Sequence, residues 1–457
     1  MKNPLGDAGL PPGPRWPRAW QTGAWISRPG PFLERCRARF GDVFTVRLVG
    51  GETFVFLADP EDVKHTFTGD PRLLRAGEAN LILRPIVGSR SVLLLDEPQH
   101  MVDRKLMLPS FHGGRMQRYG EIMVEAAQEE IARWPTGEPL ALWPRMQAIT
   151  LEVIVRAVFG LRERGRMDEL EERLRRMLDW TANPSRLAML AIGGPERMER
   201  NRRFRRAVDA VDELLLGEIA RRRESDDLAE RDDILSMLVQ ARYEDGSAMG
   251  DRELRDELVT LLVAGHETTA TSLAWALERL IRHPPALERA RAEAEAGEGE
   301  YIDAVVKETL RLRPVLPIVA RILGEPMAFG GHSLPAGATI APCIYLVHRR
   351  ADVYPDPGRF RPERFLEQAA GTYTWIPFGG GVRRCLGASF ALFEMRQVLE
   401  TVLAEVDLLP SDAASERVAR RAITLTPARQ ATAVVKARRA SAPGIAAAEP
   451  PLAAATG

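Results

Sequence analysis

The sequence predicts a mainly α-helical protein with a minor β component. A helical pattern rich in Leu, Ala, Arg and Glu dominates the chain from about Gln117 to Arg282. Short β-rich runs, separated by Pro and Gly, precede and follow it. Of the 457 residues, 45% are hydrophobic, which is enough to bury a large core. Because we find no repeat and no clear linker, we expect residues 1–439 to form a single domain and the Ala- and Pro-rich tail 440–457 to be disordered.

Charge and cysteine content argue against several classes of protein. The 63 basic and 63 acidic side chains balance, which gives no support to nucleic-acid binding or to a polybasic membrane arm. Three cysteines without a CxxC pair predict no disulfide framework and fit a reducing cytoplasm. The sequence shows neither the apolar core of a signal peptide at Met1–Leu10 nor a run of about 18 apolar residues. We therefore expect a cytoplasmic protein without a transmembrane segment, and a monomer.

The β-rich runs predict two hairpins and two further strands. Val43–Leu48 and Thr53–Leu57 flank a Gly-Gly turn and should form the first hairpin. Asp59 then caps a helix that begins at Pro60. The remaining strands are expected at Thr339–Ile340 and Ile344–Val347, and as a final hairpin at Ile423–Leu425 and Ala431–Val435.

A single long helix is predicted from Asp251 to Arg282, where His283-Pro284-Pro285 ends it. Its centre reads Ala264-Gly265-His266-Glu267-Thr268-Thr269. Glycine lowers helix stability, and a Thr hydroxyl can bond to a carbonyl one turn earlier and bend the helix. From the residues alone, this centre is either a harmless kink in a core helix or a stretch widened for a purpose.

The segment from Phe378 to Gly387 carries the most specific pattern. Its three consecutive glycines let the backbone turn tightly and approach a flat ligand. Cys385 lies just before a helix expected over Ala388–Glu400, so backbone N–H groups and two arginines, Arg383 and Arg384, would stabilise a thiolate. A thiolate is a strong ligand for ferric iron. The alternative is a buried structural cysteine, which we assign to Cys36 and Cys343 as core or surface thiols.

Five identities in this segment match Phe-x-x-Gly-x-Arg-x-Cys-x-Gly, which resembles the haem-binding loop of the cytochrome P-450 family. The resemblance runs in order along nearly the whole chain. It implies the fold of that family, with haem b bound between the long central helix and the helix after the cysteine loop, and Cys385 as the iron ligand. The haem contacts that it implies in these two elements are Phe378, Gly381, Arg383, Gly387 and Ala264.

The centre of the long helix resembles the oxygen-activation motif of the same family. The resemblance implies that Thr268 hydrogen-bonds the bound oxygen and that Glu267 feeds protons to it from solvent; both are residue types suited to proton relay. His266 falls at the variable position of the motif, and we expect it to be exposed rather than catalytic.

Two further sets of charged residues match the family. Glu308 and Arg311 are three residues apart on a predicted helix over Tyr301–Leu312, and surface pairing is the simplest interpretation. By resemblance they form a buried structural brace with Arg364. The haem propionates need cationic partners, and the resemblance supplies Arg383, His100, Arg104 and Arg321. For His100 and Arg104, which share a helix face, a solvated surface remains the alternative.

The resemblance implies a monooxygenase that activates O2 and hydroxylates or epoxidises an apolar substrate such as a fatty acid, terpenoid or steroid. No flavin or iron–sulfur module is fused, so a separate ferredoxin and ferredoxin reductase are the expected electron donors. Alternatives are a peroxygenase or isomerase of the same fold and a non-catalytic haem sensor. The implied substrate-binding residues are apolar, as any core would be. They are Leu93, Leu94, Val263, Val315, Leu316, Ile318 and Val319.

Overall fold

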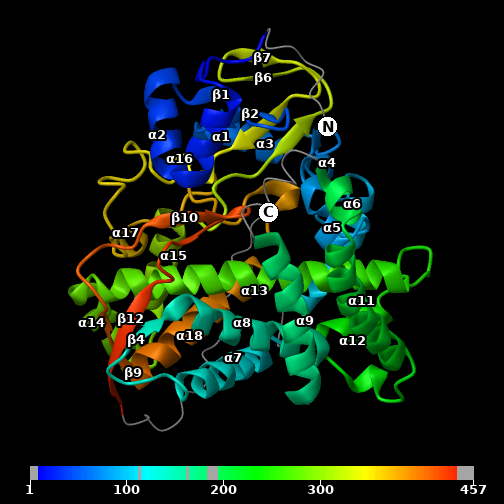
Figure 1. Ribbon diagram of the computed structural model, residues 1–457, viewed down its shortest axis with the longest axis vertical. Coiled ribbons are helices and arrows are strands. Elements are labelled where there is room, and N and C mark those ends of the chain that lie inside the picture. The colour runs from blue at the N-terminus through cyan, green and yellow to red at the C-terminus, as the bar shows by residue number, and fades with distance from the viewer. Residues whose placement is uncertain (1–8, 112–114, 161–163, 183–193, 440–457) are drawn as a thin grey trace.

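The computed structural model describes residues 9–111, 115–160, 164–182 and 194–439, and these form a mainly helical fold with four small sheets (Figure 1). The helices of more than seven residues are α1 (Arg18–Ser27), α2 (Pro29–Phe40), α3 (Pro60–Thr68), α6 (Gln99–Met107), α7 (Arg115–Ile131), α8 (Leu142–Phe159), α9 (Arg164–Ala182), α11 (Arg202–Arg223), α13 (Asp251–Ile281), α14 (Pro284–Ala296), α15 (Glu300–Leu312) and α18 (Ala388–Glu405). The shorter ones are α4 (Ala76–Ala79), α5 (Arg84–Val87), α12 (Ile234–Gln240), α16 (Ile344–Val347) and α17 (Arg364–Glu367).

The strands lie outside the helical half of the molecule or along its rim (Figure 1). The largest sheet has the order β1-β2-β8-β5-β3, in which only β2 and β8 run parallel. Its strands are β1 (Val43–Arg47), β2 (Thr53–Leu57), β3 (Leu74–Arg75), β5 (Arg321–Leu323) and β8 (Thr339–Pro342). The smaller sheets comprise β4 (Pro139–Ala141), β9 (Val406–Pro410) and β12 (Thr432–Arg438), the pair β6 (Met327–Phe329) and β7 (His332–Leu334), and the pair β10 (Val418–Arg421) and β11 (Thr424–Pro427).

Helix α13 is the axis of the fold. It crosses the middle of the molecule, α8 and α18 pack against it, and α7 packs against these two helices, all around the largest hydrophobic core (Figure 1). Its buried leucines, including Leu254, Leu258, Leu273 and Leu277, confirm the helical spacing predicted from the sequence. The predicted first hairpin and the Asp59 cap are also confirmed, since β1 pairs with β2 and the Asp59 carboxylate accepts from the Glu61 N–H.

Two predictions about strands are wrong. Ile344–Val347 forms one helical turn, α16, because β8 ends at Pro342 and the chain turns there with all four side chains buried. A strand preference of β-branched residues is weak against such a context. The final hairpin joins β10 to β11 through Ala422 at φ 51°, whereas β12 pairs with β4 and β9. The sequence did not predict β10, because Arg420 and Arg421 break the apolar alternation expected of a strand. The tail 440–457 lies outside the described residues.

Candidate active site

The cysteine loop is fixed by its own backbone and by contact with α3. The Cys385 N–H donates to the Phe378 carbonyl at 2.9 Å, which closes the loop just before α18. Gly381 has φ +64°, and a Cβ on it would lie 2.0 Å from the Phe67 carbonyl oxygen. A Cβ on Gly380 would lie 2.2 Å from the Phe67 ring. These glycines therefore allow the loop to lie against α3, a requirement that the sequence pattern did not reveal.

The Cys385 side chain is exposed, yet enough protein surrounds it for burial to be the main influence on its pKa. Burial raises the pKa of the thiol, while the Gly387 N–H and the charges of Arg104 and Arg384 lower it. The net direction is upward, so these groups alone do not make a stable thiolate. A bound ferric ion would supply the missing positive charge. The sequence predicted that Arg383 and Arg384 would stabilise the thiolate. In the structure Arg104 and Arg384 have this effect, and the Arg383 guanidinium is paired with Asp96.

At the centre of α13, the predicted back-bond is present. The Thr268 hydroxyl donates to the Ala264 carbonyl at 2.6 Å, and Ala264 is exposed in the middle of an otherwise buried helix. The helix continues unbroken through the motif. Gly265 lets α8 approach, because an added Cβ would lie 3.3 Å from Ile154 Cδ1.

Helix α8 also makes hydrogen bonds to His266 and Glu267 of the motif. The Gln147 amide donates to the Glu267 carboxylate at 3.0 Å, so an uncharged partner orients this acid. The expectation that His266 is exposed is wrong, because its ring is buried and lies 3.0 Å from the Thr150 hydroxyl. Burial and then the charge of Arg421 lower the pKa of His266 to about 4. Since α8 packs closely along α13, the variable position of the motif faces protein rather than solvent.

The residues expected to bind propionates form a cationic cluster, which we call the clamp: His100, Arg104, Arg321 and Arg383. Arg383 pairs with Asp96 at 3.1 Å, and Arg321 donates to its neighbour's carbonyl, that of Ala320, at 2.8 Å. Burial and then Arg383 lower the pKa of Arg321 to about 10. Burial and then Arg383 also lower the pKa of His100 to about 4, against the opposing effect of Glu97 2.7 Å away. The solvated-surface alternative is therefore wrong for His100, which is buried.

A second charged cluster, the brace, comprises Glu308, Arg311 and Arg364. The Glu308 carboxylate accepts from Arg311 Nε at 2.7 Å and lies 3.1 Å from Arg364 Nε, and the first two side chains are wholly buried. Arg311 also donates to the carbonyls of His348 and Pro357, at 2.7 and 2.9 Å. The structure therefore places this pair in the interior and not on the surface.

The brace is linked to the cysteine loop through His348. Its Nε2 accepts the Ile376 N–H at 2.8 Å, and the Ile376 carbonyl accepts the Gly379 N–H at 3.0 Å. Burial, followed by the charges of Arg311 and Arg349, lowers the pKa of His348 well below its usual value, so the ring is neutral and can accept. A short chain of bonds thus joins the Glu–Arg pair to the backbone that carries Cys385.

The residues expected to line a substrate pocket lie in several places. Leu94 and Val315 are buried; Leu93, Val263, Leu316, Ile318 and Val319 are half-buried. Leu316 and Val319 pack on one hydrophobic cluster, Ile318 on a second and Val263 on the main core. The structure therefore does not gather the set into one cluster, and the proposed role of these side chains stays a prediction.

The loop before Leu93 is fastened to one face of α13. The Asp256 carboxylate accepts from the Arg90 N–H at 2.9 Å and the Glu257 carboxylate from the Val92 N–H at 2.7 Å. Burial raises the pKa of the wholly buried Glu257 well above its usual value. Beyond Leu94, Asp96 accepts from the Gly77 N–H at 2.7 Å besides pairing with Arg383. Sequence reasoning missed Asp96, Gln147 and Glu257, each of which has a partner more than a hundred residues away: Arg383, Glu267 and Val92.

The donor set fits a haem group. Cys385 offers an accessible sulfur, and the clamp carries more positive charge than Asp96 and Glu97 can balance. Arg383 Nε is buried without a hydrogen-bond partner, as expected of a guanidinium shaped to receive an anionic ligand. The fold and these groups together define the class of haem-thiolate proteins.

Comparison with known proteins identifies the family. The model of the family described as "Cytochrome P450" matches residues 11–431, and the chain belongs to this family. It is 44% identical over 440 residues to "Putative cytochrome P450 135B1" of Mycobacterium tuberculosis, covering 94% of this chain and 92% of that protein. It is 37% identical over 435 residues to "Putative cytochrome P450 137" of the same species, covering 92% and 90% of the two chains.

Solved structures show the same fold. "Crystal structure of cytochrome P450DA heme domain" matches with a TM-score of 0.82 at 24% identity, over 94% of this chain and 98% of that one. "Retinoic acid bound cyanobacterial CYP120A1" matches with a TM-score of 0.78 at 24% identity, over 93% and 99%. The chain is thus a cytochrome P450 monooxygenase, an oxidoreductase with haem b as cofactor. Within the described residues, no helix has the length and apolar character needed to cross a membrane.

Proposed function

We propose that the chain hydroxylates or epoxidises an apolar substrate, such as a fatty acid, terpenoid or steroid, with O2 and electrons from a separate ferredoxin and its reductase. Cys385 is the proposed iron ligand, and His100, Arg104, Arg321 and Arg383 the proposed propionate partners. When bound, the haem supplies the oxygen chemistry. We place the protein in the cytoplasm, which the three free cysteines support.

The observation that carries the proposal is the pair formed by the Glu267 carboxylate and the Thr268 hydroxyl, close to the exposed Ala264 in the middle of α13. The Thr268 hydroxyl donates a hydrogen bond to the Ala264 carbonyl, so the hydroxyl oxygen can still accept a hydrogen bond. Glu267 is held by the neutral amide of Gln147, which orients the carboxylate. A carboxylate and a hydroxyl at adjacent positions can pass protons from solvent toward the face of α13 on which Ala264 is exposed.

Replacing the hydroxyl tests the relay. In Thr268→Ala, NADPH consumption with a ferredoxin system and a turned-over substrate should continue while product falls by at least about tenfold and hydrogen peroxide accumulates. Ser272→Ala is the matched control, since it removes a hydroxyl that makes the same type of back-bond on the same helix. Unchanged product yield in Thr268→Ala would remove this residue from the mechanism.

Replacing the cysteine tests the ligand. The reduced, carbon-monoxide-treated protein should show a strongly red-shifted Soret band, and Cys385→Ala should abolish it. Cys36→Ala and Cys343→Ala should leave the band in place, because both thiols are buried in a hydrophobic cluster and burial raises the pKa of each to about 12. A normal band in Cys385→Ala would refute the assignment.

A further inference from the structure

The most exposed large apolar side chains of the described structure are concentrated at α1. Trp20 is 73% exposed, Ile26 53% and Trp16 48%, and every other exposed large hydrophobic side chain in the described ranges reaches 45% or less. Isolated exposed hydrophobic residues are common on protein surfaces and need no explanation. Three within eleven residues form a patch, which we call the tryptophan face.

The tryptophan face is presented by a helix that is firmly held from behind. Trp25 and Gln21 point inward, and the Gln21 side chain bonds to the carbonyls of Pro14 and Trp16 and to the Arg47 N–H. At 100° per residue, Ala19, Gly23 and Ile26 fall on the side opposite Gln21 and Trp25, with Trp20 next to them. The inner side is held by Trp25 and the hydrogen bonds of Gln21, whereas the apolar outer side is left exposed by the described residues.

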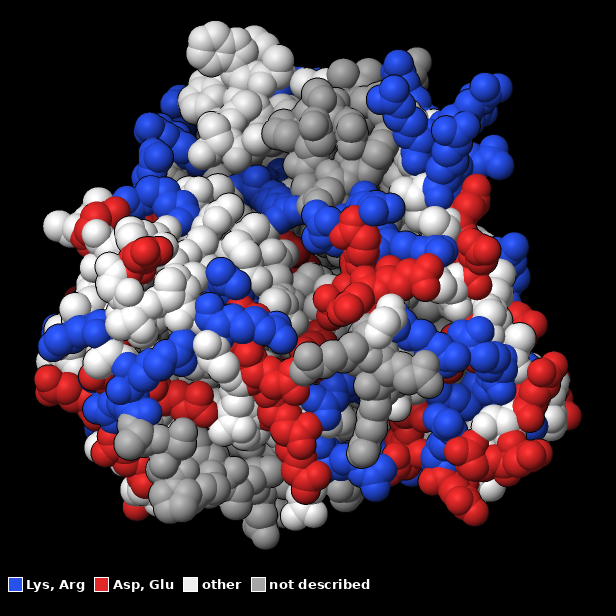
Figure 2. Space-filling model, turned by 60° about the horizontal axis from the view of Figure 1, so that its bottom comes forward, with Lys and Arg blue, Asp and Glu red and all other residues white. Residues whose placement is uncertain are grey.

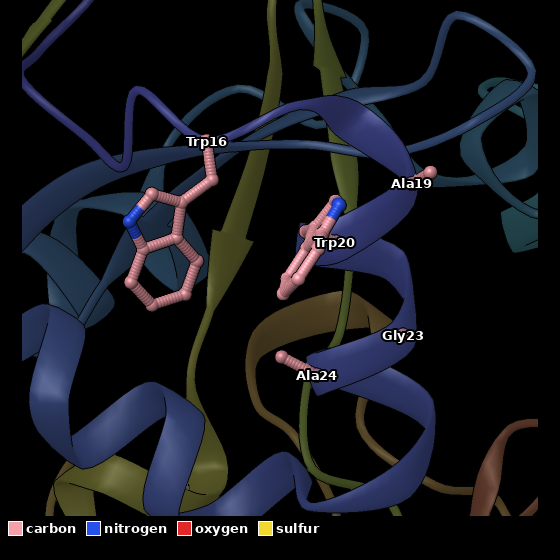
Figure 3. Close-up of a pocket in the computed structure, with 5 residues that line it drawn as sticks. All are labelled: Trp16, Ala19, Trp20, Gly23 and Ala24. Atoms are coloured by element: carbon pink, nitrogen blue, oxygen red, sulfur yellow. The ribbon is translucent and has the colours of Figure 1, made fainter.

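The outer side contains a hollow lined almost entirely by apolar atoms. The rings of Trp16 and Trp20 flank it, and Ala19, Gly23 and Ala24 complete its wall (Figure 3). Because Gly23 has no atom of the protein within 4 Å of an added Cβ, this side is open to whatever approaches.

The chain segment that carries the tryptophan face has charges of one sign only. Residues 9–33 contain Arg15, Arg18 and Arg28 and not one Asp or Glu. The three arginines are exposed, and within the described ranges no carboxylate pairs with them. Elsewhere the surface arginines are commonly paired, as in Arg72–Asp70 and Arg361–Glu367, and basic and acidic side chains intermingle (Figure 2).

We propose that the tryptophan face rests on the surface of a membrane of anionic phospholipid. Tryptophan is the side chain that settles at the level of lipid headgroups, with its ring in the apolar boundary and its N–H in the polar layer. An interfacial helix binds through an apolar face combined with basic residues that are attracted to anionic lipid. Arg15, Arg18 and Arg28 supply that charge beside Trp16, Trp20 and Ile26. The contact proposed is with the membrane surface, since none of the helices in the described ranges is long and apolar enough to cross a bilayer.

The test is vesicle binding of the full-length, haem-loaded protein. Sedimentation with vesicles of equal parts phosphatidylglycerol and phosphatidylcholine is compared with vesicles of phosphatidylcholine alone. Binding is expected to the anionic vesicles and to weaken with added salt. The double variant Trp16→Ser, Trp20→Ser should bind at least about tenfold more weakly. Arg15→Gln and Arg28→Gln should each weaken binding about fivefold.

Matched controls separate this surface from general stickiness. Leu409→Ser removes an exposed apolar side chain on β9, and Arg205→Gln removes an exposed arginine on α11, so both should bind as the parent does. Haem content and the carbon-monoxide spectrum show whether each variant is folded. Absence of binding to the anionic vesicles, or equal binding by the tryptophan double variant, would overturn the proposal. So would a concentration-dependent dimer that this variant abolishes, because a second copy would then cover the face.

Discussion

The brace and the clamp are both clusters of buried arginines, and they solve the problem of buried charge in opposite ways. In the brace, Arg311 bonds to Glu308 and to three backbone carbonyls, those of His348, Pro357 and Arg359. In the clamp, Arg321 has one carbonyl and Arg383 keeps a buried Nε without a partner. The central pair of the brace, Glu308 and Arg311, is satisfied within the protein, and only the outer Arg364 keeps a buried Nη2 without a partner. In the clamp, by contrast, Arg321 has no carboxylate partner and Arg383 has hydrogen-bonding capacity left over.

The difference suggests how a structural charge cluster can be told from a ligand-binding one. Burying a charge is costly unless hydrogen bonds and an opposite charge offset the loss of water. A cluster that meets this cost internally stabilises the fold. A cluster that does not meet this cost is expected where a ligand brings the opposite charge. Haem would bring it as the carboxylates of its two propionates. Three perturbations test whether the contrast is real.

The largest effect is expected in the brace. Arg311→Leu leaves the wholly buried Glu308 without its main partner, so the free energy of unfolding should fall by about 3–5 kcal/mol. Thermal unfolding followed by circular dichroism, together with the yield of haem-loaded protein, measures it. Arg361→Ala breaks an exposed pair with Glu367 in the same region and should cost about 1 kcal/mol or less. Equal effects in the two variants would erase the distinction.

The second effect is a pH dependence that originates in the clamp. The pKa of His100 is about 4 in the fold and 6.5 in an unfolded chain, so the unfolded chain binds the proton first as pH falls. Stability is therefore full above pH 6.5 and declines between about pH 6.5 and 4, by about 3 kcal/mol from this group. Haem-free protein unfolded in urea across this range should show the decline, and His100→Asn should flatten it. The decline should be smaller in the haem-loaded protein, since a propionate nearby favours the protonated ring.

The smallest effect is the most diagnostic. Arg321→Leu removes a buried cation that lacks a carboxylate partner, so the haem-free protein should be as stable as the parent or more stable. Haem affinity should nonetheless fall about tenfold, because a charge-assisted bond to a propionate is lost. Haem transfer to a scavenging globin reports the second quantity. A destabilised haem-free variant with unchanged haem affinity would place Arg321 with the brace.

The contrast between the clusters also shows how far the sequence could lead. The helix α13, the cysteine loop and the Glu308–Arg311 pair follow from local spacing and were predicted from it. Nothing local indicates that Asp96 meets Arg383, that Gln147 meets Glu267 or that Glu257 meets Val92, because these partners are 120 to 287 residues apart. His266 was wrongly expected to be exposed for the same reason, since a neighbouring helix decides its burial.

The loop from Arg90 to Asp96, which contacts both α13 and the clamp, has a consequence for how new substrate specificities could arise. Its backbone N–H groups at Arg90 and Val92 donate to carboxylates of α13, and the side chain of Asp96 pairs with Arg383. The side chains of Leu93 and Leu94 make none of these bonds. Under the prediction that these two residues line the substrate pocket, mutation could exchange their side chains while the path of the chain stays the same, so descendants of this protein could change specificity here without rebuilding the loop.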